Sequence, residues 1–569
     1  MTAGDIPMDD TAVGVPCYLG VDIGTSSSKG VLVSPDGEVL RSAVREHRVS
    51  RPAPGQVEMD GELWWEEFGQ IAEELTGDVS QAPGYARGDA PTAGSSAPGD
   101  LVVLGVGVSG MGPCVLLTDE HDVPVRPAIL YGVDTRAGEQ IISLHEQLGG
   151  PEVVMEGSGS VLTTQAVGPK LRWVAEHEPE AWARARRLFM PASWLAYRLT
   201  GEYVLDRHSA SQCTPLLDRH TQEWHADWAP LVAEHLELPP LRWPAEQVGT
   251  MKEPVAGIPA GTPVVAGTID AWTEALSVGA QQPGDLMLMY GTTLFLIATG
   301  TAPVTSPVMW GTTGALPGTF NLAGGMATSG ALTAWVRELA GDVPYETLLA
   351  EAALSPAGAH GLLALPYFAG ERTPVQDPDA RGVLAGLTLS HTRGDLYRAM
   401  LEATAFGVRH NVEALREAGV PIDRVVAVGG GTQGGLWTQI VSDVTGLEQV
   451  VRRTSIGASY GAAWLAATAV ASGSGGGVGN GDGGGVGDGD GGVSGDSAPD
   501  IAAWNPTEVV VRPDPSTRQT YDRLYAAYRD LYPATREIVH TLADLQRSTP
   551  LPSSDPNSTP LPSTTDRRP

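Results

Sequence analysis

Residues 21–30 read VDIGTSSSKG and lie between two apolar runs, residues 18–21 and 30–33. The apolar runs predict two β-strands, and the polar residues between them predict a turn. Gly24 lets a ligand approach the backbone closely, while the hydroxyl and N–H groups of residues 25–28 can face anionic oxygens. The stretch therefore predicts a phosphate-binding hairpin. On this stretch alone, an ordinary hairpin with a polar tip is the alternative.

Two later segments repeat the pattern of an apolar run followed by a glycine turn. Residues 286–290 lead into Gly-Thr-Thr at 291–293, and residues 425–428 lead into three glycines at 429–431. Neither the Walker pattern GxxxxGK[ST] nor a GxGxxG after a first strand is present, which argues against a P-loop or a NAD site. Three strand-to-glycine turns are thus spread over the chain, which makes the ordinary hairpin the weaker interpretation.

These turns, in this order, resemble those of the sugar kinases of the FGGY carbohydrate kinase family, within the actin/hexokinase/Hsp70 superfamily. The resemblance runs from about residue 18 to residue 470 and resumes weakly over residues 505–545. It equates residues 22–30, 291–293 and 429–431 with the first phosphate loop, the second phosphate loop and the adenosine loop. It implies an α/β fold of two actin-like (ribonuclease H-like) lobes with a nucleotide cleft between them. The stretch GASYGAA at 457–463 resembles the helix that connects the lobes.

The length of 569 residues exceeds one ordinary core, so two lobes are expected. We expect an N-terminal lobe over residues 17–267, which carries the sugar site and the first phosphate loop. A C-terminal lobe over residues 268–470 is expected to bind ATP, and a helix over residues 504–547 to dock on it. Three segments are poor in apolar residues. Residues 78–100 are expected to be a flexible insertion, residues 471–503 a Gly-rich disordered linker, and residues 548–569 a disordered tail.

The chain is strongly acidic, with a formal net charge of -31 from 36 basic and 67 acidic residues. This charge argues against nucleic acid or an anionic membrane as a partner. Cys17, Cys114 and Cys213 lack metal-ligand spacing, so they are interpreted as buried, reduced thiols. No signal peptide or membrane-spanning run is recognised, which predicts a cytoplasmic protein. A homodimer is left open.

The candidate catalytic residue is Asp270, which follows the apolar run 263–266 in the stretch GTIDAW. In the resembling family the Asp at this position is the general base, so the resemblance implies that role for Asp270. The alternative is that Asp270 only caps a helix over residues 271–277.

The resemblance implies ATP and Mg²⁺ as cofactors. Asp22 would hold the metal through its water shell, with Asp270 as the second carboxylate beside it. The phosphates would lie between the two lobes, and three further glycines would admit the nucleotide; the residues concerned are Gly24, Thr25, Lys29, Gly291, Thr292, Thr293, Gly330, Gly430 and Gly431. For Lys29, a solvated lysine at a strand end is the alternative.

The sugar-contacting residues of the family fall on Met111, Gly112 and Pro113, where the Met-His pair of bacterial xylulokinases aligns with Gly112 and Pro113. The Asn that follows the catalytic Asp in those kinases is Ala271 here, so both departures remove polar contacts. Tyr131 can stack on a polyol and Asp134 can bind hydroxyls, although Asp134 can equally start a helix.

The stretch PYFAGERTP at 366–374 is very like that of xylulokinases, although a loop that packs the lobes together is the alternative. The resemblance therefore implies ATP-dependent phosphorylation of the terminal hydroxyl of a ketopentose, D-xylulose to D-xylulose 5-phosphate. Another pentulose, a tetrulose and a polyol such as glycerol are alternative substrates. A non-catalytic actin-like ATP-binding protein is the alternative from a different class.

Overall fold

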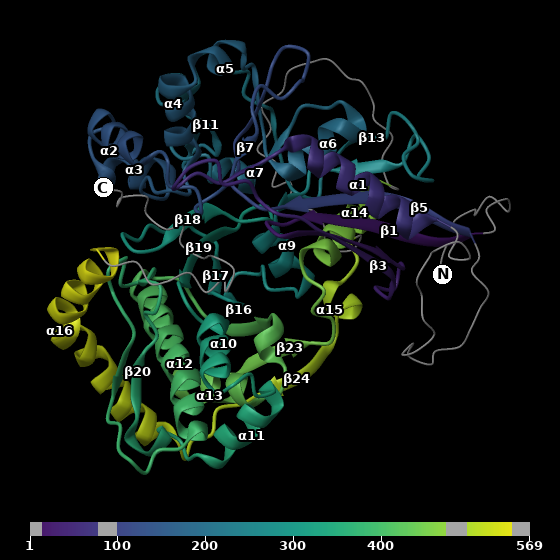
Figure 1. Ribbon diagram of the computed structural model, residues 1–569. Coiled ribbons are helices and arrows are strands. Elements are labelled where there is room, and N and C mark those ends of the chain that lie inside the picture. Colours follow the sequence, from purple (N-terminus) through teal and green to yellow (C-terminus); the bar gives the residue numbers. More distant parts are fainter. Residues whose placement is uncertain (1–13, 78–99, 474–497, 549–569) are drawn as a thin grey trace, which may run out of the picture.

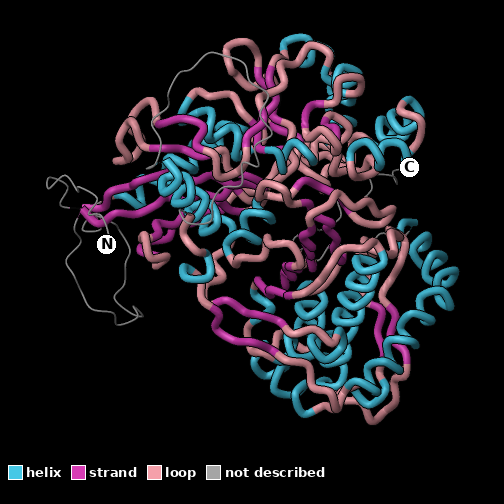
Figure 2. Tube along the Cα trace, turned by 180° about the vertical axis from the view of Figure 1, so that it is seen from behind, coloured by secondary structure: helices cyan, strands magenta, loops and turns pink. Residues whose placement is uncertain are grey.

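The computed structural model describes residues 14–77, 100–473 and 498–548. The chain forms two lobes, one above the other in Figure 1, and each is built on a seven-stranded sheet. Seen from behind in Figure 2, strands run through the interior of each lobe and helices cover them. The predicted two-lobed α/β fold is confirmed. Within the described ranges, no helix has the length and apolar character needed to cross a bilayer.

The first sheet begins with the predicted hairpin, which is confirmed. β1 (Gly14–Ile23) pairs antiparallel with β2 (Ser27–Val33), and β2 pairs antiparallel with β3 (Val39–Glu46). β5 (Asp100–Gly110) runs parallel to β1 on its other side. The sheet continues through β14 (Pro263–Val265) and β13 (Gln247–Thr250), and β15 (Thr268–Ile269) pairs with the end of β5.

The second sheet repeats this arrangement. β16 (Asp285–Tyr290) pairs antiparallel with β17 (Leu294–Gly300), and β17 pairs antiparallel with β19 (Phe320–Met326), beside β18 (Trp310–Thr313). On its other side β16 runs parallel to β22 (Arg424–Val428). β23 (Gln449–Arg452) and β24 (Thr507–Val511) complete the sheet. The two predicted phosphate turns therefore occupy equivalent places, between the first two strands of each sheet.

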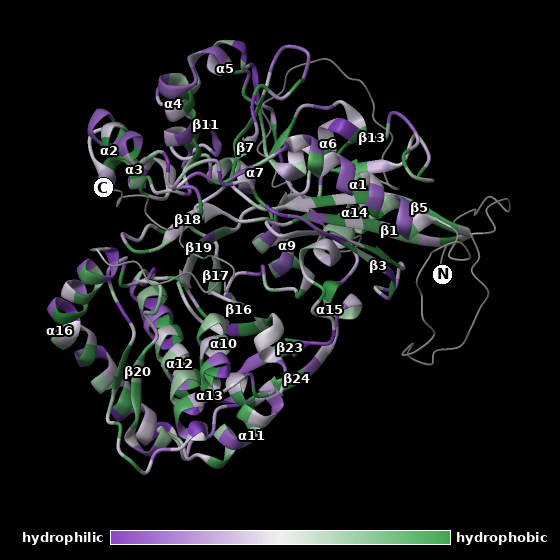
Figure 3. Ribbon diagram, in the orientation of Figure 1, coloured by the Kyte–Doolittle hydropathy of each residue, from purple (hydrophilic) through white to green (hydrophobic). Residues whose placement is uncertain are grey.

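A helix of small residues crosses from the second lobe to the first. α14 (Ala458–Gly473) follows β23 of the second sheet but packs on β1 and β5 of the first, two strands rich in the hydrophobic residues coloured green in Figure 3. Its backbone lies directly on the strands: a Cβ at Gly20 would lie 2.0 Å from the carbonyl oxygen of Ser459, and one at Gly107 would lie 1.8 Å from that of Ala462. Only glycine fits such contacts.

The remaining helices surround the two sheets. In the first lobe these are α1 (Gly61–Thr76), α2 (Gly138–Gln147), α3 (Pro151–Ser158), α4 (Val167–His177), α5 (Pro179–Arg184), α6 (Pro191–Thr200), α7 (Arg207–Ser211), α8 (Ala229–Ala233) and α9 (Asp270–Ser277). In the second lobe they are α10 (Gly330–Leu339), α11 (Tyr345–Leu354), α12 (Arg393–Glu417), α13 (Leu436–Thr445), α16 (Arg518–Ser548) and the 3-10 turns η2 (Ala359–Gly361) and η3 (Gly430–Thr432). α15 (Ile501–Trp504) contacts the first lobe, where Trp504 donates to the carbonyl oxygen of Pro35.

Short strands form small two-stranded sheets outside the main ones. They are β4 (Glu58–Met59), β6 (Leu116–Thr118), β7 (Ala128–Ile129), β8 (Arg187–Phe189), β9 (Leu205–Asp206), β10 (Leu217–Asp218), β11 (Glu223–Trp224), β12 (Leu241–Arg242), β20 (Leu363–Leu365) and β21 (Val383–Ala385).

The lobe boundary and the C-terminal region differ in detail from the predicted ranges. β15 lies in the first sheet, so the chain leaves the first lobe later than residue 267. In the predicted helical region 504–547, β24 comes first as an edge strand. α16 then packs on α13 and β20, and its buried Tyr521, Tyr525 and Tyr528 contact Phe406 of α12.

The predicted insertion and tail lie almost wholly outside the described residues. The predicted linker does so over residues 474–497, whereas residues 471–473 end α14 and α15 begins at Ile501. All three cysteines are buried and free, as predicted.

Candidate active site

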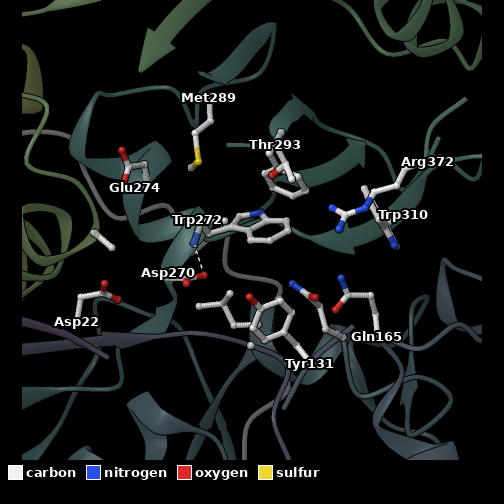
Figure 4. Close-up of a pocket in the computed structure, with 16 residues that line it drawn as sticks. Asp22, Tyr131, Gln165, Asp270, Trp272, Glu274, Met289, Thr293, Trp310 and Arg372 are labelled. Atoms are coloured by element: carbon white, nitrogen blue, oxygen red, sulfur yellow. Dashed lines mark hydrogen bonds between the residues drawn. The ribbon is translucent and has the colours of Figure 1, made fainter. Parts of the chain in front are cut away.

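A cavity of about 330 Å³ lies between the lobes and is lined by residues of both. Figure 4 shows its lining side chains converging around Asp270. Several residues predicted from the sequence line it: Asp22, Gly112, Tyr131, Asp270 and Thr293. Segments that are more than 200 residues apart in the chain are therefore brought together at one site.

Hydrogen bonds from buried side chains hold the first phosphate turn in place. His47 donates from Nε2 to the carbonyl oxygen of Gly24 at 3.0 Å, and its Nδ1 lies 2.9 Å from a carboxylate oxygen of Glu67. The hydroxyl of Ser28 donates to the same carboxylate at 2.5 Å. His47 and Glu67 are almost fully buried, with 5% of each side chain exposed. The turn is thus fixed to β3 and to α1, which carries Glu67.

Thr25 connects this turn to the predicted sugar site. Its hydroxyl lies 2.9 Å from the phenolic oxygen of Tyr131, and it also contacts the sulfur of Met111. Met111 itself is buried in the core of the first lobe and donates its backbone N–H to the carbonyl oxygen of Ile23. Met111 therefore supports the first phosphate turn from the core of the lobe, while the next residue, Gly112, lines the cavity.

Asp22 and Asp270 face the same cavity from β1 and α9. Burial raises the pKa of both carboxyls above the ordinary aspartate range, and the negative charge of Asp270 raises the pKa of Asp22 further. The Oδ1 atom of Asp22 is buried and has no hydrogen-bond partner. Such a group is costly unless a ligand satisfies it.

The geometry gives no support to Asp270 as a simple helix cap. α9 begins at Asp270 itself, with Ile269 as the N-cap, and no side-chain hydrogen bond caps the helix. The Asp270 carboxylate accepts only the N–H of the next residue, Ala271, at 2.7 Å. Its remaining acceptor positions are directed to the cavity, where a substrate hydroxyl can reach them.

Glu274 is a third carboxylate of the cavity, one turn after Asp270 on α9. Burial raises its pKa to about 7, the charge of Asp270 adds to this, and the charge of Lys29 opposes it. Lys29 lies opposite Asp22 in the β1–β2 register, and its charge also opposes the raised pKa of Asp22. Lys29 is exposed and does not line the cavity wall.

A second cavity, of about 630 Å³, lies in the second lobe beside the other phosphate turn. Five of the residues predicted to bind the nucleotide line it: Gly291, Thr292, Gly330, Gly430 and Gly431. Because Thr293 of the same turn lines the first cavity, the Gly291–Thr293 turn borders both cavities. Aromatic side chains complete the walls of the second cavity: Tyr290, Tyr345, Tyr397 and Trp437.

Backbone hydrogen bonds hold the second phosphate turn. The N–H groups of Ser329 and Ala331 donate to the carbonyl oxygen of Thr292 at 3.1 and 3.0 Å, and that of Gly330 donates to the carbonyl oxygen of Gly291 at 2.9 Å. A Cβ on Gly330 would lie 2.6 Å from the Gly291 oxygen. The start of α10 is therefore fitted against this turn, and only glycine allows the contact.

Besides Met111, two of the predicted substrate-binding residues lie away from the cavity wall. Asp134 is 1% exposed. Its carboxylate accepts from the guanidinium of Arg136 at 2.8 Å and from the backbone N–H of Val57 at 2.6 Å. These partners occupy its oxygens, which agrees with the structural alternative. Pro113 is buried behind Gly112 and is also absent from the lining.

Other side chains of the first cavity are missing from the sequence-based prediction: Gln165, Gln212, Trp272, Glu274, Phe295, Trp310 and Arg372. Trp272 and Arg372 lie inside stretches that the sequence did mark, GTIDAW at 267–272 and PYFAGERTP at 366–374. Gln165 precedes α4 and Gln212 follows α7, and no local pattern marks either of them. Only the fold brings these amides to the site.

The profiles of one family match most of the chain. The "FGGY family of carbohydrate kinases, N-terminal domain" matches residues 17–277, and the C-terminal domain of the same family matches residues 286–470. The chain therefore belongs to the FGGY family of carbohydrate kinases, which confirms the predicted resemblance. It is a sugar kinase, and kinases of this family use ATP.

The similar proteins of known identity are sugar and polyol kinases. The xylulose kinase of Escherichia coli (strain K12) is 30% identical over 461 residues, which are 79% of this chain and 89% of that protein. The glycerol kinase of Nocardia farcinica (strain IFM 10152) is 31% identical over 468 residues, 78% of this chain and 88% of that protein. The crystal structure of xylulose kinase from Rhodospirillum rubrum, 31% identical, superposes with a TM-score of 0.78 over 92% of this chain and 100% of that one.

Proposed function

We propose that the protein transfers the γ-phosphoryl group of ATP to the terminal hydroxyl of D-xylulose and forms D-xylulose 5-phosphate. The observation that carries this proposal is the place of Asp270, in a cavity bordered by both phosphate turns and adjoining the nucleotide cavity. The similarity to xylulose kinases supports the choice of sugar.

In the proposed reaction Asp270 accepts the proton of the sugar hydroxyl as the oxygen attacks phosphorus. A carboxyl whose pKa is raised by burial is a better proton acceptor than a solvated aspartate. Phosphoryl transfer otherwise requires positioning and neutralisation of charge on the phosphate oxygens. Thr25 and Lys29 of the first lobe, with Thr292 and Thr293 of the second, would supply these contacts.

The residues at the first turn fit Mg²⁺, which usually keeps several waters and takes one or two carboxylates together with substrate phosphates. Asp22, with its unpartnered buried oxygen, would hold the ion, and Asp270 is the second carboxylate beside it. When bound, Mg²⁺ neutralises charge on the phosphates. In the part of the chain that the structure describes, no group of three or more His, Cys, Asp or Glu could hold a metal ion.

The nucleotide would lie in the second cavity, with its adenosine beside Gly430 and Gly431. A Cβ at Gly430 would have no atom within 4 Å, so the space beside it is open. The phosphates would then pass the Gly291–Thr293 turn toward Asp270. A cytoplasmic location and a homodimer stay predictions.

The test measures ADP release with D-xylulose, other pentuloses, tetruloses and glycerol, for the wild type and for Asp270→Asn. We expect D-xylulose to stimulate release most, and the variant to lose about a hundredfold or more in kcat because the proton acceptor is gone. Asp342→Asn is the matched control, since Asp342 is exposed at the end of α10. ADP release that no sugar stimulates would refute the kinase proposal, whereas full activity of Asp270→Asn would refute the role of Asp270.

A further inference from the structure

The two ends of the first cavity differ in charge. Figure 4 shows Asp22 and Glu274 at one end, Asp270 near the middle, and Gln165, Trp310 and Arg372 at the other end. The first end holds Asp22, which precedes the first phosphate turn, so we expect the reacting hydroxyl beside Asp270 to point toward that end. The opposite end must then receive the part of the sugar that is farthest from the reacting hydroxyl.

Arg372 presents unpaired donors at that opposite end. Among the described residues its guanidinium has neither an ion pair nor a hydrogen bond. The hydrogen bonds of Arg372 are made by its backbone, whose N–H donates to Glu371 and whose carbonyl oxygen accepts from the N–H of Gln376. A guanidinium carries five N–H donors and no acceptor, so it can only bind acceptor oxygens.

Gln165 presents a second donor, from the opposite lobe. Its Oε1 accepts the backbone N–H of Gly132 at 3.0 Å, and this contact requires the oxygen at that position. The NH₂ group of the amide therefore remains available to the cavity. Gln165 precedes α4 of the first lobe, whereas Arg372 lies between β20 and β21 of the second.

A group that offers only acceptor electron pairs fits this pair of donors. A 2-ketopentose has such a group, because its carbonyl lies toward one end of the carbon chain and its reacting hydroxyl at the other. The carbonyl oxygen accepts hydrogen bonds and cannot donate one. In the reduced polyol a hydroxyl replaces it. The hydroxyl oxygen can still accept, but its hydrogen needs an acceptor, which neither a guanidinium nor an amide NH₂ supplies.

We infer that Gln165 and Arg372 bind the carbonyl end of a 2-ketose from opposite lobes and thereby select ketoses over polyols. This inference rests on the proposed function. It also accounts for the polar contacts that Gly112 and Ala271 do not provide, because the amide and the guanidinium supply them from elsewhere in the same cavity. Both residues are specificity determinants and take no part in the proton transfer.

The experiment compares D-xylulose with xylitol, which has the same carbon chain and a hydroxyl in place of the carbonyl. Steady-state ADP release gives kcat/KM for both compounds, and tryptophan fluorescence titration gives their binding without turnover, since Trp272 and Trp310 line the cavity. The variants are Arg372→Met, which keeps the apolar stem, Arg372→Lys, and Gln165→Met. Arg416→Met is the control, because Arg416 is exposed on α12 and lines neither the sugar cavity nor the nucleotide cavity.

We expect Arg372→Met to lower kcat/KM for D-xylulose about 10- to 100-fold, as for hydrogen bonds from a charged group, and Gln165→Met to lower it about tenfold. Values for xylitol should change less than about twofold, the KM for ATP should not change, and Arg372→Lys should fall between wild type and Arg372→Met.

Equal losses for ketose and polyol would overturn the inference, as would an effect of Arg372→Met on the KM for ATP alone. A wild type that binds xylitol, or the acid D-xylonate, more tightly than D-xylulose would overturn it as well. If the wild type phosphorylates a different 2-ketose best, the proposed substrate is wrong, but the ratio of that ketose to its own polyol still tests the inference.

Discussion

The two phosphate turns share a sequence pattern and a place in their sheets, but different interactions hold them. In the first lobe, side chains support the turn: His47 binds the Gly24 carbonyl oxygen, and Glu67 binds His47. In the second lobe, the backbone at the start of α10 binds the carbonyl oxygens of Gly291 and Thr292. Equivalent turns of a duplicated architecture are thus sensitive to different kinds of substitution.

The turns also differ in charge. Asp22 lies two residues before Gly24, and Met289 lies two residues before Gly291, and both side chains line the sugar cavity. Before the first turn the cavity therefore receives the carboxylate of Asp22, and before the second turn it receives the neutral thioether of Met289. Of these two positions, only that of Asp22 titrates.

The largest expected effect is at the second turn. Gly330→Val places side-chain atoms where a Cβ alone would lie 2.6 Å from the Gly291 carbonyl oxygen, so the turn must shift. We expect kcat/KM for ATP to fall about a hundredfold or more, because small displacements of reacting groups are costly. Gly300→Ala is the control, since no atom lies within 4 Å of a Cβ at Gly300. An unchanged KM and kcat in Gly330→Val would show that this contact does not position the turn.

A smaller effect is expected at the first turn, where side chains carry the support. Glu67→Ala removes the acceptor for Ser28 and His47, and we expect the KM for ATP to rise about tenfold while the KM for sugar changes little. Glu67→Gln should recover most of the loss, because the amide oxygen accepts from Ser28 and its NH₂ can donate to Nδ1 of His47.

Glu73→Ala is the control for this pair of variants, since Glu73 is exposed on the same helix. Glu67→Gln with a loss as large as that of Glu67→Ala would mean that the negative charge, and not the hydrogen-bond geometry, supports the turn.

The smallest effect concerns the difference in charge. Burial raises the pKa of Asp22, so its ionisation opposes folding, and this cost appears as the pH rises above the ordinary aspartate range toward the raised pKa. Without nucleotide or metal, Asp22→Asn should therefore raise the unfolding midpoint at pH 8 by about 1–3 °C more than at pH 5. Met289→Leu should shift it equally at both pH values. A shift for Asp22→Asn that is independent of pH would contradict this account.

Much of the fold could be predicted because its signals are local. The hairpin at residues 18–33 follows from apolar runs and a polar turn, and the glycine turns mark the ends of strands. β24 was not predicted, because a five-residue edge strand next to a long helical pattern carries little signal of its own. The predicted lobe boundary at residue 267 is early because β15, only two residues long, returns to the first sheet before α9 begins.

The candidate site could be predicted only in part, because only some of its residues lie in local sequence motifs. Asp22, Asp270 and the glycines lie in motifs with a fixed spacing, whereas Gln165 and Arg372 reach the cavity from loops of different lobes. Asp134 shows the opposite error. Its spacing to Arg136 resembles a substrate motif, but the structure uses the pair as a buried ion pair behind the site.

The position of α14 has a consequence for how the chain is made. The helix that covers β1 and β5 comes from residues 458–473, so the lobe that contains the N-terminus lacks part of its core until nearly the whole chain has been synthesised. Contacts of such long sequence separation form late and slowly. The first lobe to leave the ribosome is therefore the last to complete its fold, and until then the faces of Gly20 and Gly107 that receive α14 stay open to solvent.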